Sequence, residues 1–170
     1  ETLAWLRSRS GRWPAGRRAG SSAADPALAG CLRRFGSKET GAAHGRDYLM
    51  WRYAGDLYGD YRVWQVTGAG LQGFVVARAE ADAEIVVDVY CDAASRARIL
   101  HGFARTSPAA VVRASFFGET VRRDFAAAGY LVRATGSRLV GLSRDAALQA
   151  ELAARNWVVY AGESDFDLLR

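Results

Sequence analysis

The run Glu84 to Tyr90 (EIVVDVY) constrains the fold of this chain more than any other segment. It is almost wholly apolar and rich in β-branched residues, which is typical of a strand in the middle of a sheet. Directly after it, the apolar spacing changes to a helix period over Ala94 to Arg105. That spacing places Ile99, Leu100 and Phe103 on one face of the helix. A buried strand followed by an amphipathic helix predicts an α/β fold.

The segments on both sides of this strand alternate between strand and helix patterns. Before it, Tyr61 to Val66 and Leu71 to Arg78 flank a Gly-Ala-Gly turn and predict a β-hairpin, preceded by a short helix around YLMWRY. After it, the predicted strands are Ala110 to Phe116, Tyr130 to Ala134, Leu139 to Leu142 and Trp157 to Tyr160, and the predicted helices are Glu119 to Ala128 and Ala146 to Ala154. This order predicts a mixed α/β sheet flanked by helices.

The N-terminal segment differs in charge from the rest of the chain. Residues 1–40 hold seven Arg and one Lys against Glu1, Asp25 and Glu39, a balance of +5 that equals the net charge of the whole chain. The remaining residues are therefore neutral overall, which argues against nucleic-acid binding by the folded body. We predict an Arg/Gly/Ser-rich leader or linker over 1–45 and a folded domain over 46–170. Within the leader, Asp25 and Pro26 are expected to start a short helix that runs through Arg34.

The cysteines, the histidines and the apolar runs exclude several classes of protein. Cys31 and Cys91 form no motif with each other or with His44 and His101, so we predict no metal site and the reduced thiols of a cytoplasmic protein. No apolar run approaches the ~20 residues that a membrane-spanning helix needs, so no membrane partner is expected.

Three short motifs carry a resemblance to a known family. VRRDFAAAGYLV, with Phe125 followed by Gly129-Tyr130, resembles the helix-to-strand passage near the end of the GCN5-related N-acetyltransferase (GNAT) fold. The early WRY and the terminal GESDFD resemble motifs in the C-terminal half of longer bacterial GNAT-like proteins. The resemblance covers about 120 residues, from Tyr48 to Asp167. It implies a mostly antiparallel central sheet and a chain that is part of a longer protein.

The resemblance also implies a function, the transfer of an acyl group from acetyl-CoA or another acyl-CoA to an amine. In this reading Asp88 or a water molecule takes the amine proton, and Tyr130 or Tyr160 protonates the departing thiolate. Two further groups are expected to bind the acceptor, an amino sugar or an envelope precursor. They are Trp51, Arg52 and Tyr53 near the N-terminal side, and Glu163 and Asp165 near the end.

The chain departs from the family at the loop that binds the cofactor. Active members follow the central strand with a glycine-containing turn whose backbone N–H groups hold the pyrophosphate of the coenzyme. Here residues 91–98 contain no glycine, and Asp92 adds a negative charge. The residues expected at the cofactor are Ala93, Ser95, Arg96 and Arg98. A second hypothesis is therefore a catalytically silent GNAT-like module that binds no cofactor and that supports a partner half-domain or self-associates as a homodimer.

Each candidate residue also has a purely structural interpretation. Strand alternation places Val86, Asp88 and Tyr90 on one face, where Asp88 would bond to Arg52 or to a backbone turn. Trp51 and the tyrosines would fill the core. Glu163 and Asp165 would form a solvated tail.

Overall fold

The structure of the protein is a computed structural model. It describes residues 2–7, 17–21, 26–28, 30, 46–54, 60–68, 71–134, 145–155 and 159–160. The strands are β1 (Thr2–Arg7), β2 (Arg17–Ser21), β3 (Tyr61–Gly68), β4 (Leu71–Glu80), β5 (Ala83–Tyr90), β6 (Val111–Phe117), β7 (Leu131–Ala134) and β8 (Val159–Tyr160). The helices are α2 (Arg46–Tyr53), α3 (Arg96–Thr106), α4 (Glu119–Ala127) and α5 (Ala146–Ala154), with a 3-10 turn, η1 (Ala93–Ser95), before α3.

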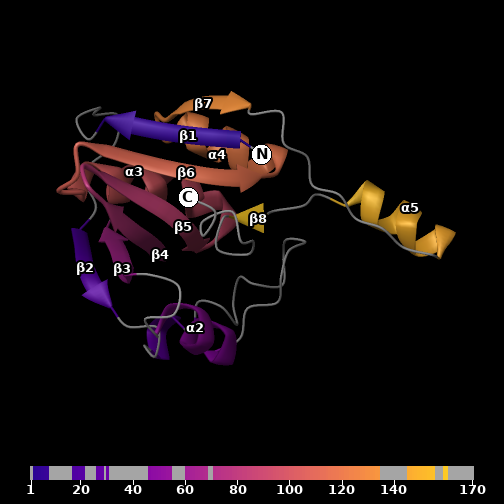
Figure 1. The fold of residues 1–170 in the computed structure, drawn as a ribbon, viewed down its shortest axis with the longest axis horizontal. Coiled ribbons are helices and arrows are strands. Elements are labelled where there is room, and N and C mark those ends of the chain that lie inside the picture. The colour runs from indigo at the N-terminus through magenta and orange to yellow at the C-terminus, as the bar shows by residue number, and fades with distance from the viewer. Residues whose placement is uncertain are drawn as a thin grey trace.

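The strands form one mixed sheet (Figure 1). Its order is β2-β3-β4-β5-β6-β1-β7, and β8 pairs with β6 outside this path. Among the described strands, β5 and β6 run parallel and all other paired neighbours run antiparallel. The helix α3 makes the crossover between the two parallel strands, as parallel neighbours require. The α/β class with a mixed, mostly antiparallel sheet flanked by helices is therefore confirmed.

Two hydrophobic cores lie on opposite faces of this sheet. Val75 and Ala77 of β4 belong to a core that includes α3 and α4, whereas Phe74 and Val76, which alternate with them, belong to a core that includes α2. We call these the α3/α4 core and the α2 core. In Figure 1, α3 and α4 lie behind the sheet, α2 lies below it, and α5 projects away from it.

The segment predicted as a leader or linker contributes two strands to the sheet. β1 lies between β6 and β7 and is antiparallel to both, while β2 forms the far edge beside β3. Residues 26–28 and 30 are helical, which agrees with the short helix predicted after Asp25, and Leu28 is buried in the α2 core. Composition indicated a leader or linker here, but the backbone of an Arg-rich segment can pair with a sheet like any other.

The helix α3 packs on β4 at a close approach. Ile99, Leu100 and Phe103 are fully buried, which confirms the predicted apolar face. The backbone of Gly73 in β4 faces this helix, and a Cβ atom at that position would lie 2.9 Å from Cβ of Cys91 and 3.0 Å from Cγ1 of Ile99. Gly73 therefore sets how closely α3 can lie on the sheet.

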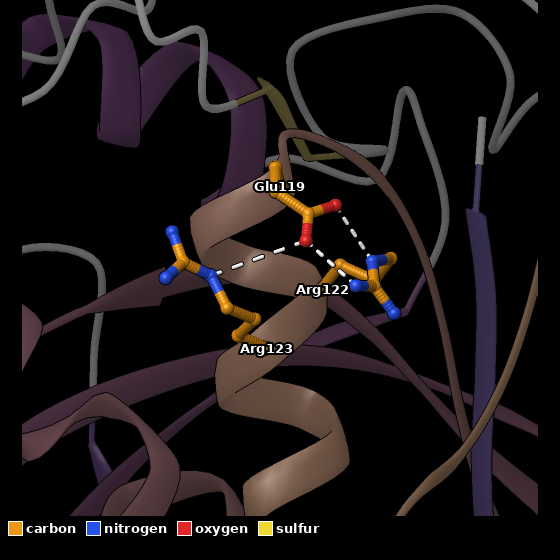
Figure 2. Close-up of polar contacts among 3 residues, drawn as sticks. All are labelled: Glu119, Arg122 and Arg123. Atoms are coloured by element: carbon orange, nitrogen blue, oxygen red, sulfur yellow. Dashed lines mark hydrogen bonds and ion pairs between the residues drawn. The ribbon is translucent and has the colours of Figure 1, made fainter.

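The helix α4 begins with an exposed group of ion pairs, shown in Figure 2. Arg122 donates two hydrogen bonds to the carboxylate of Glu119, from Nε at 2.7 Å and from Nη2 at 2.6 Å. Nε of Arg123 lies 4.0 Å from the same carboxylate. A negative charge in the first turn also interacts favourably with the helix dipole. These contacts stabilise the start of α4, at the end of β6.

Several predictions fall outside the described residues. The strand expected at Leu139 to Leu142 lies there, as do Glu163 and Asp165 of the terminal acidic motif. Of the last predicted strand, Val159 and Tyr160 form β8. Among the helices that the structure describes, none is both long enough and apolar enough to cross a membrane.

Candidate functional site

A bulge in β5 sets the geometry of the candidate site. Val76 of β4 pairs with Asp88, but the next residue, Ala77, pairs with Val86. Val87 is therefore the extra residue on β5, with no partner on β4. A bulge of this kind bends a strand and changes which way its side chains point.

The bulge shifts the alternation of the side chains along β5. Val86 and Val89 lie in the α3/α4 core, whereas Val87 and Tyr90 lie in the α2 core. The predicted face of Val86, Asp88 and Tyr90 is therefore wrong at Val86, because one extra residue reverses the strand period. Asp88 and Tyr90 do share a face, and it is the face that α2 covers.

Asp88 accepts hydrogen bonds from two tyrosines in this core. The hydroxyl of Tyr53, at the end of α2, donates to Oδ2 of Asp88, and the hydroxyl of Tyr90 donates to the same oxygen at 3.0 Å. Asp88 is only 1% exposed, so these donors compensate for the water that its carboxylate loses. Burial raises the pKa of Tyr53, and the charge of Asp88 raises it further, so the tyrosine remains a neutral donor.

The helix α2 divides the predicted WRY acceptor site between the core and the surface. Arg52 and Tyr53 are buried, whereas Trp51 is 56% exposed. Tyr53 also contacts the ring of Tyr61 edge-on, with 5.2 Å between the centroids, and Tyr48 packs against Trp51 at 5.8 Å. The structure thus brings Tyr53 to Asp88 and leaves Trp51 at the surface of the same helix.

The segment after β5 contains the residues predicted at the cofactor. It forms η1 and the start of α3, and Asp92 and Ser95 make no side-chain capping bond there. Arg96 is buried and forms an ion pair with Asp124 of α4, at 2.9 Å from Nη1 to Oδ2. Ala93 and Ser95 are half-buried, and Arg98 is exposed. Of the two arginines, Arg98 is thus the one with a solvent-accessible side chain at the start of α3.

Tyr130, a predicted proton donor, lies in the α3/α4 core, on the opposite face of the sheet from Asp88. Its ring packs edge-on against Phe125 at 4.9 Å, and its hydroxyl donates to the carbonyl of Leu100 at 3.4 Å. Burial raises the pKa of Tyr130, and the nearby Glu84 raises it further. The structure does not bring Tyr130 and Asp88 together.

Other buried polar groups were not identified by sequence reasoning. The hydroxyl of Ser107 donates to Oε2 of Glu84 at 2.6 Å, and Nδ1 of His101 lies 3.1 Å from the carbonyl oxygen of Ala128. Glu84, His101 and Tyr90 are all buried. The available signal was that Glu84, Asp88 and Tyr90 share one apolar strand, where each polar group requires a partner. Among the described residues, no group of His, Cys, Asp and Glu is arranged to hold a metal ion.

β5 and β6 are paired over only half of their length. Their parallel register runs from Ala83 opposite Val111 to Val86 opposite Ala114, and it stops where the bulge begins. Beyond that point β8 pairs with β6. We call the region between the C-terminal halves of β5 and β6 the split; Asp88 lies on its β5 side. The backbone of Tyr160 is part of β8 and pairs with Phe116, on the β6 side of the split.

Comparisons with known proteins give no relative for this chain: no family model, no curated protein and no solved structure matches it.

Proposed function

We propose that this chain is a GNAT-like acetyltransferase domain, an acyl-CoA-dependent N-acyltransferase that acts on an amine. The observation that carries the proposal is the split, where β5 and β6 part after Val86. A ligand with an extended chain can bind between parted strands through hydrogen bonds to their backbones, in the manner of an added strand. The pantetheine arm of coenzyme A has two amide groups and suits such a position.

The residues on the α2 face supply a proton acceptor and a proton donor. When the amine nitrogen bonds to the acyl carbon, the carbon–sulfur bond breaks, and the proton lost by the amine passes to Oδ2 of Asp88. The departing thiolate takes a proton from a tyrosine hydroxyl. Tyr90 is better placed for this than Tyr130, because its hydroxyl lies 3.0 Å from Oδ2 of Asp88. The hydrogen bonds from Tyr53 and Tyr90 hold the carboxylate of Asp88 in place.

The acceptor is proposed to approach from the side of α2. Trp51 offers an exposed aromatic surface there, beside the buried Tyr53 that contacts Asp88. An aromatic face packs well on a sugar ring, which fits an amino sugar or an envelope precursor as the acceptor class. The pyrophosphate of the donor is proposed to lie near Ala93, Ser95 and the exposed Arg98 at the start of α3.

Calorimetric titration with acetyl-CoA tests donor binding, and an acetyl-transfer assay with a panel of amino sugars tests the reaction. We expect Asp88→Asn to retain acetyl-CoA binding and to lose at least about 100-fold in transfer rate, because it removes the base. Glu119→Gln is the matched control, since it makes the same carboxylate-to-amide change at an exposed site. A folded Asp88→Asn variant with full transfer activity would refute the role of Asp88.

The second candidate is a catalytically silent GNAT-like module that supports a partner half-domain or forms a homodimer. The ion pair of buried Arg96 with Asp124 favours this candidate, because it gives the arginine a structural role between α3 and α4 rather than at a cofactor. The absence of glycine from residues 91–98 points the same way. Absence of heat with millimolar acetyl-CoA, together with a dimer or hetero-complex by light scattering, would favour this candidate over the enzyme.

A further inference from the structure

The edge of β6 to which β8 binds can be deduced from the registers. β1 pairs with β6 up to Thr2 opposite Phe116, so β1 occupies one edge of β6 as far as Phe116. β8 pairs with the same region, Tyr160 opposite Phe116 and Val159 opposite Phe117. A strand has two edges, so β8 lies on the other edge of β6, the edge that faces β5. Figure 1 shows β8 at this end of β5 and β6, and β8 approaches β5 as well.

β8 therefore occupies the split. β5 pairs with β6 up to Val86, and β8 takes the place of β5 beside β6 from Phe116 onward. Phe116, which pairs with Tyr160 of β8, is buried, and so are Val89 and Tyr90 at the end of β5. An extended segment of this chain thus lies where the proposed function requires an extended part of the ligand.

We propose that β8 is a displaceable plug, an autoinhibitory segment that competes with the pantetheine arm of acyl-CoA for the split. This inference rests on the proposed function. Among the residues that the structure describes, β8 pairs with β6 outside the continuous strand order, whereas β1 pairs with a strand on each side. Segments at the margin of a sheet open at lower free energy than its core strands, so β8 is suited to leave β6 while the rest of the sheet stays paired.

Competition of this kind lowers the observed affinity for the ligand. If the split is open in only a fraction of the molecules, the apparent dissociation constant is the intrinsic constant divided by that fraction. A substitution that weakens the pairing of β8 raises the open fraction, and acetyl-CoA then binds more tightly. A substitution that leaves the backbone of β8 unchanged has no such effect.

Val159→Pro tests the proposal, because proline removes a backbone N–H and is poorly tolerated in a paired strand. Val159→Thr is the matched control, since it keeps the N–H and the β-branch at the same position. We expect Val159→Pro to bind acetyl-CoA at least about fivefold more tightly than the wild type in calorimetric titration, and Val159→Thr to bind like the wild type. Equal or weaker binding by the proline variant would overturn the plug and leave acyl-CoA binding intact.

Hydrogen exchange gives a second readout that does not depend on affinity. In the proline variant without ligand, we expect the backbone amides near Phe116 and Phe117 to exchange faster, while those of Val112 and Ala114 remain protected and show that the sheet is folded. Acetyl-CoA should restore the protection near Phe117. If none of the three proteins binds acetyl-CoA, the proposed function fails and the plug fails with it. If the wild type and both variants bind acetyl-CoA with equal affinity, only the proposal that β8 is a plug fails.

Discussion

At the scale of single residues, the environment of Asp88 depends on a one-residue irregularity. Without the bulge, Val86 and Asp88 would lie on one face, under the same helices. With Val87 as the extra residue, Val86 enters the α3/α4 core and Asp88 meets Tyr53 and Tyr90. The carboxylate thus lies among hydroxyl donors rather than among aliphatic groups, which is why it can remain buried at low cost.

The contact between Tyr53 and Asp88 is expected to contribute measurably to stability. Tyr53→Phe removes one donor from a buried carboxylate, so we expect the free energy of unfolding to fall by about 1–3 kcal/mol in urea denaturation. In the background of Asp88→Asn, the same change should cost less, because the charged acceptor is already gone. Equal losses in both backgrounds would mean that the two side chains are not energetically coupled.

The exposed group at the start of α4 predicts a dependence on pH. Hydrogen bonding and charge from Arg122 lower the pKa of Glu119 below its ordinary value. A lowered folded-state pKa gives stability that is present above the unfolded-state pKa and is lost as the pH falls through the folded-state pKa. Carboxyl titration by NMR should show Glu119 titrating below an ordinary glutamate, and Arg122→Ala should bring its pKa back. High salt should weaken the effect, since the pair is exposed.

At the scale of elements, the end of α4 shows how a short motif fixes a chain direction. The N–H of Gly129 bonds to the carbonyl of Ala126, and the N–H of Tyr130 bonds to that of Phe125, both at 3.0 Å. These two bonds form a Schellman motif, which needs a left-handed residue, and Gly129 has φ of 95°. The contact between the rings of Phe125 and Tyr130 completes the motif. The pattern of Phe125, three alanines and Gly129-Tyr130 thus has a local structural explanation.

Gly129→Ala is therefore expected to destabilise the protein. A residue with a Cβ atom pays about 1–2 kcal/mol to adopt this conformation, so the midpoint of urea unfolding should fall accordingly. Gly129→Asn should cost less, because asparagine tolerates left-handed φ better than alanine. If alanine and asparagine were equally harmful, the loss would come from side-chain volume rather than from backbone strain.

At the scale of the whole molecule, β1 joins the last strand to the rest of the sheet. β6 and β7 are consecutive in the chain apart from α4, yet they do not pair with each other, because β1 lies between them. Removing β1 would leave two strand edges without a backbone partner, which is costly for a sheet. The N-terminal segment is thus part of the fold despite its basic composition.

Ala4→Pro tests this arrangement. Ala4 pairs with Ala114 on one side and with Val132 on the other, so its N–H faces a neighbouring strand in either case. We expect loss of that hydrogen bond to lower the free energy of unfolding by at least about 1–3 kcal/mol. Ala4→Ser, which keeps the N–H, is the control. A proline variant as stable as the serine variant would show that β1 does not lie inside the sheet.

The sequence predicts the elements of the candidate site but not the contacts between them. Apolar spacing and the change of period after Tyr90 place β5 and α3 correctly, because burial patterns are local in the chain. The pairing of Tyr53 with Asp88 joins residues 35 positions apart. The ion pair of Arg96 with Asp124 likewise joins two helices. Such contacts depend on how elements pack, and a single sequence has no signal for that.

By itself, the sequence determined the α/β class, the hairpin of β3 and β4, the central strand and the apolar face of α3. Each of these follows from a period of two or 3.6 residues that the chain must obey locally. Only the tertiary structure decided that β1 enters the sheet, that a bulge turns Asp88 toward α2, and that β8 lies in the split beside β6. The reason is that strand neighbours and register are set by pairings between distant segments, whose energies depend on the whole sheet.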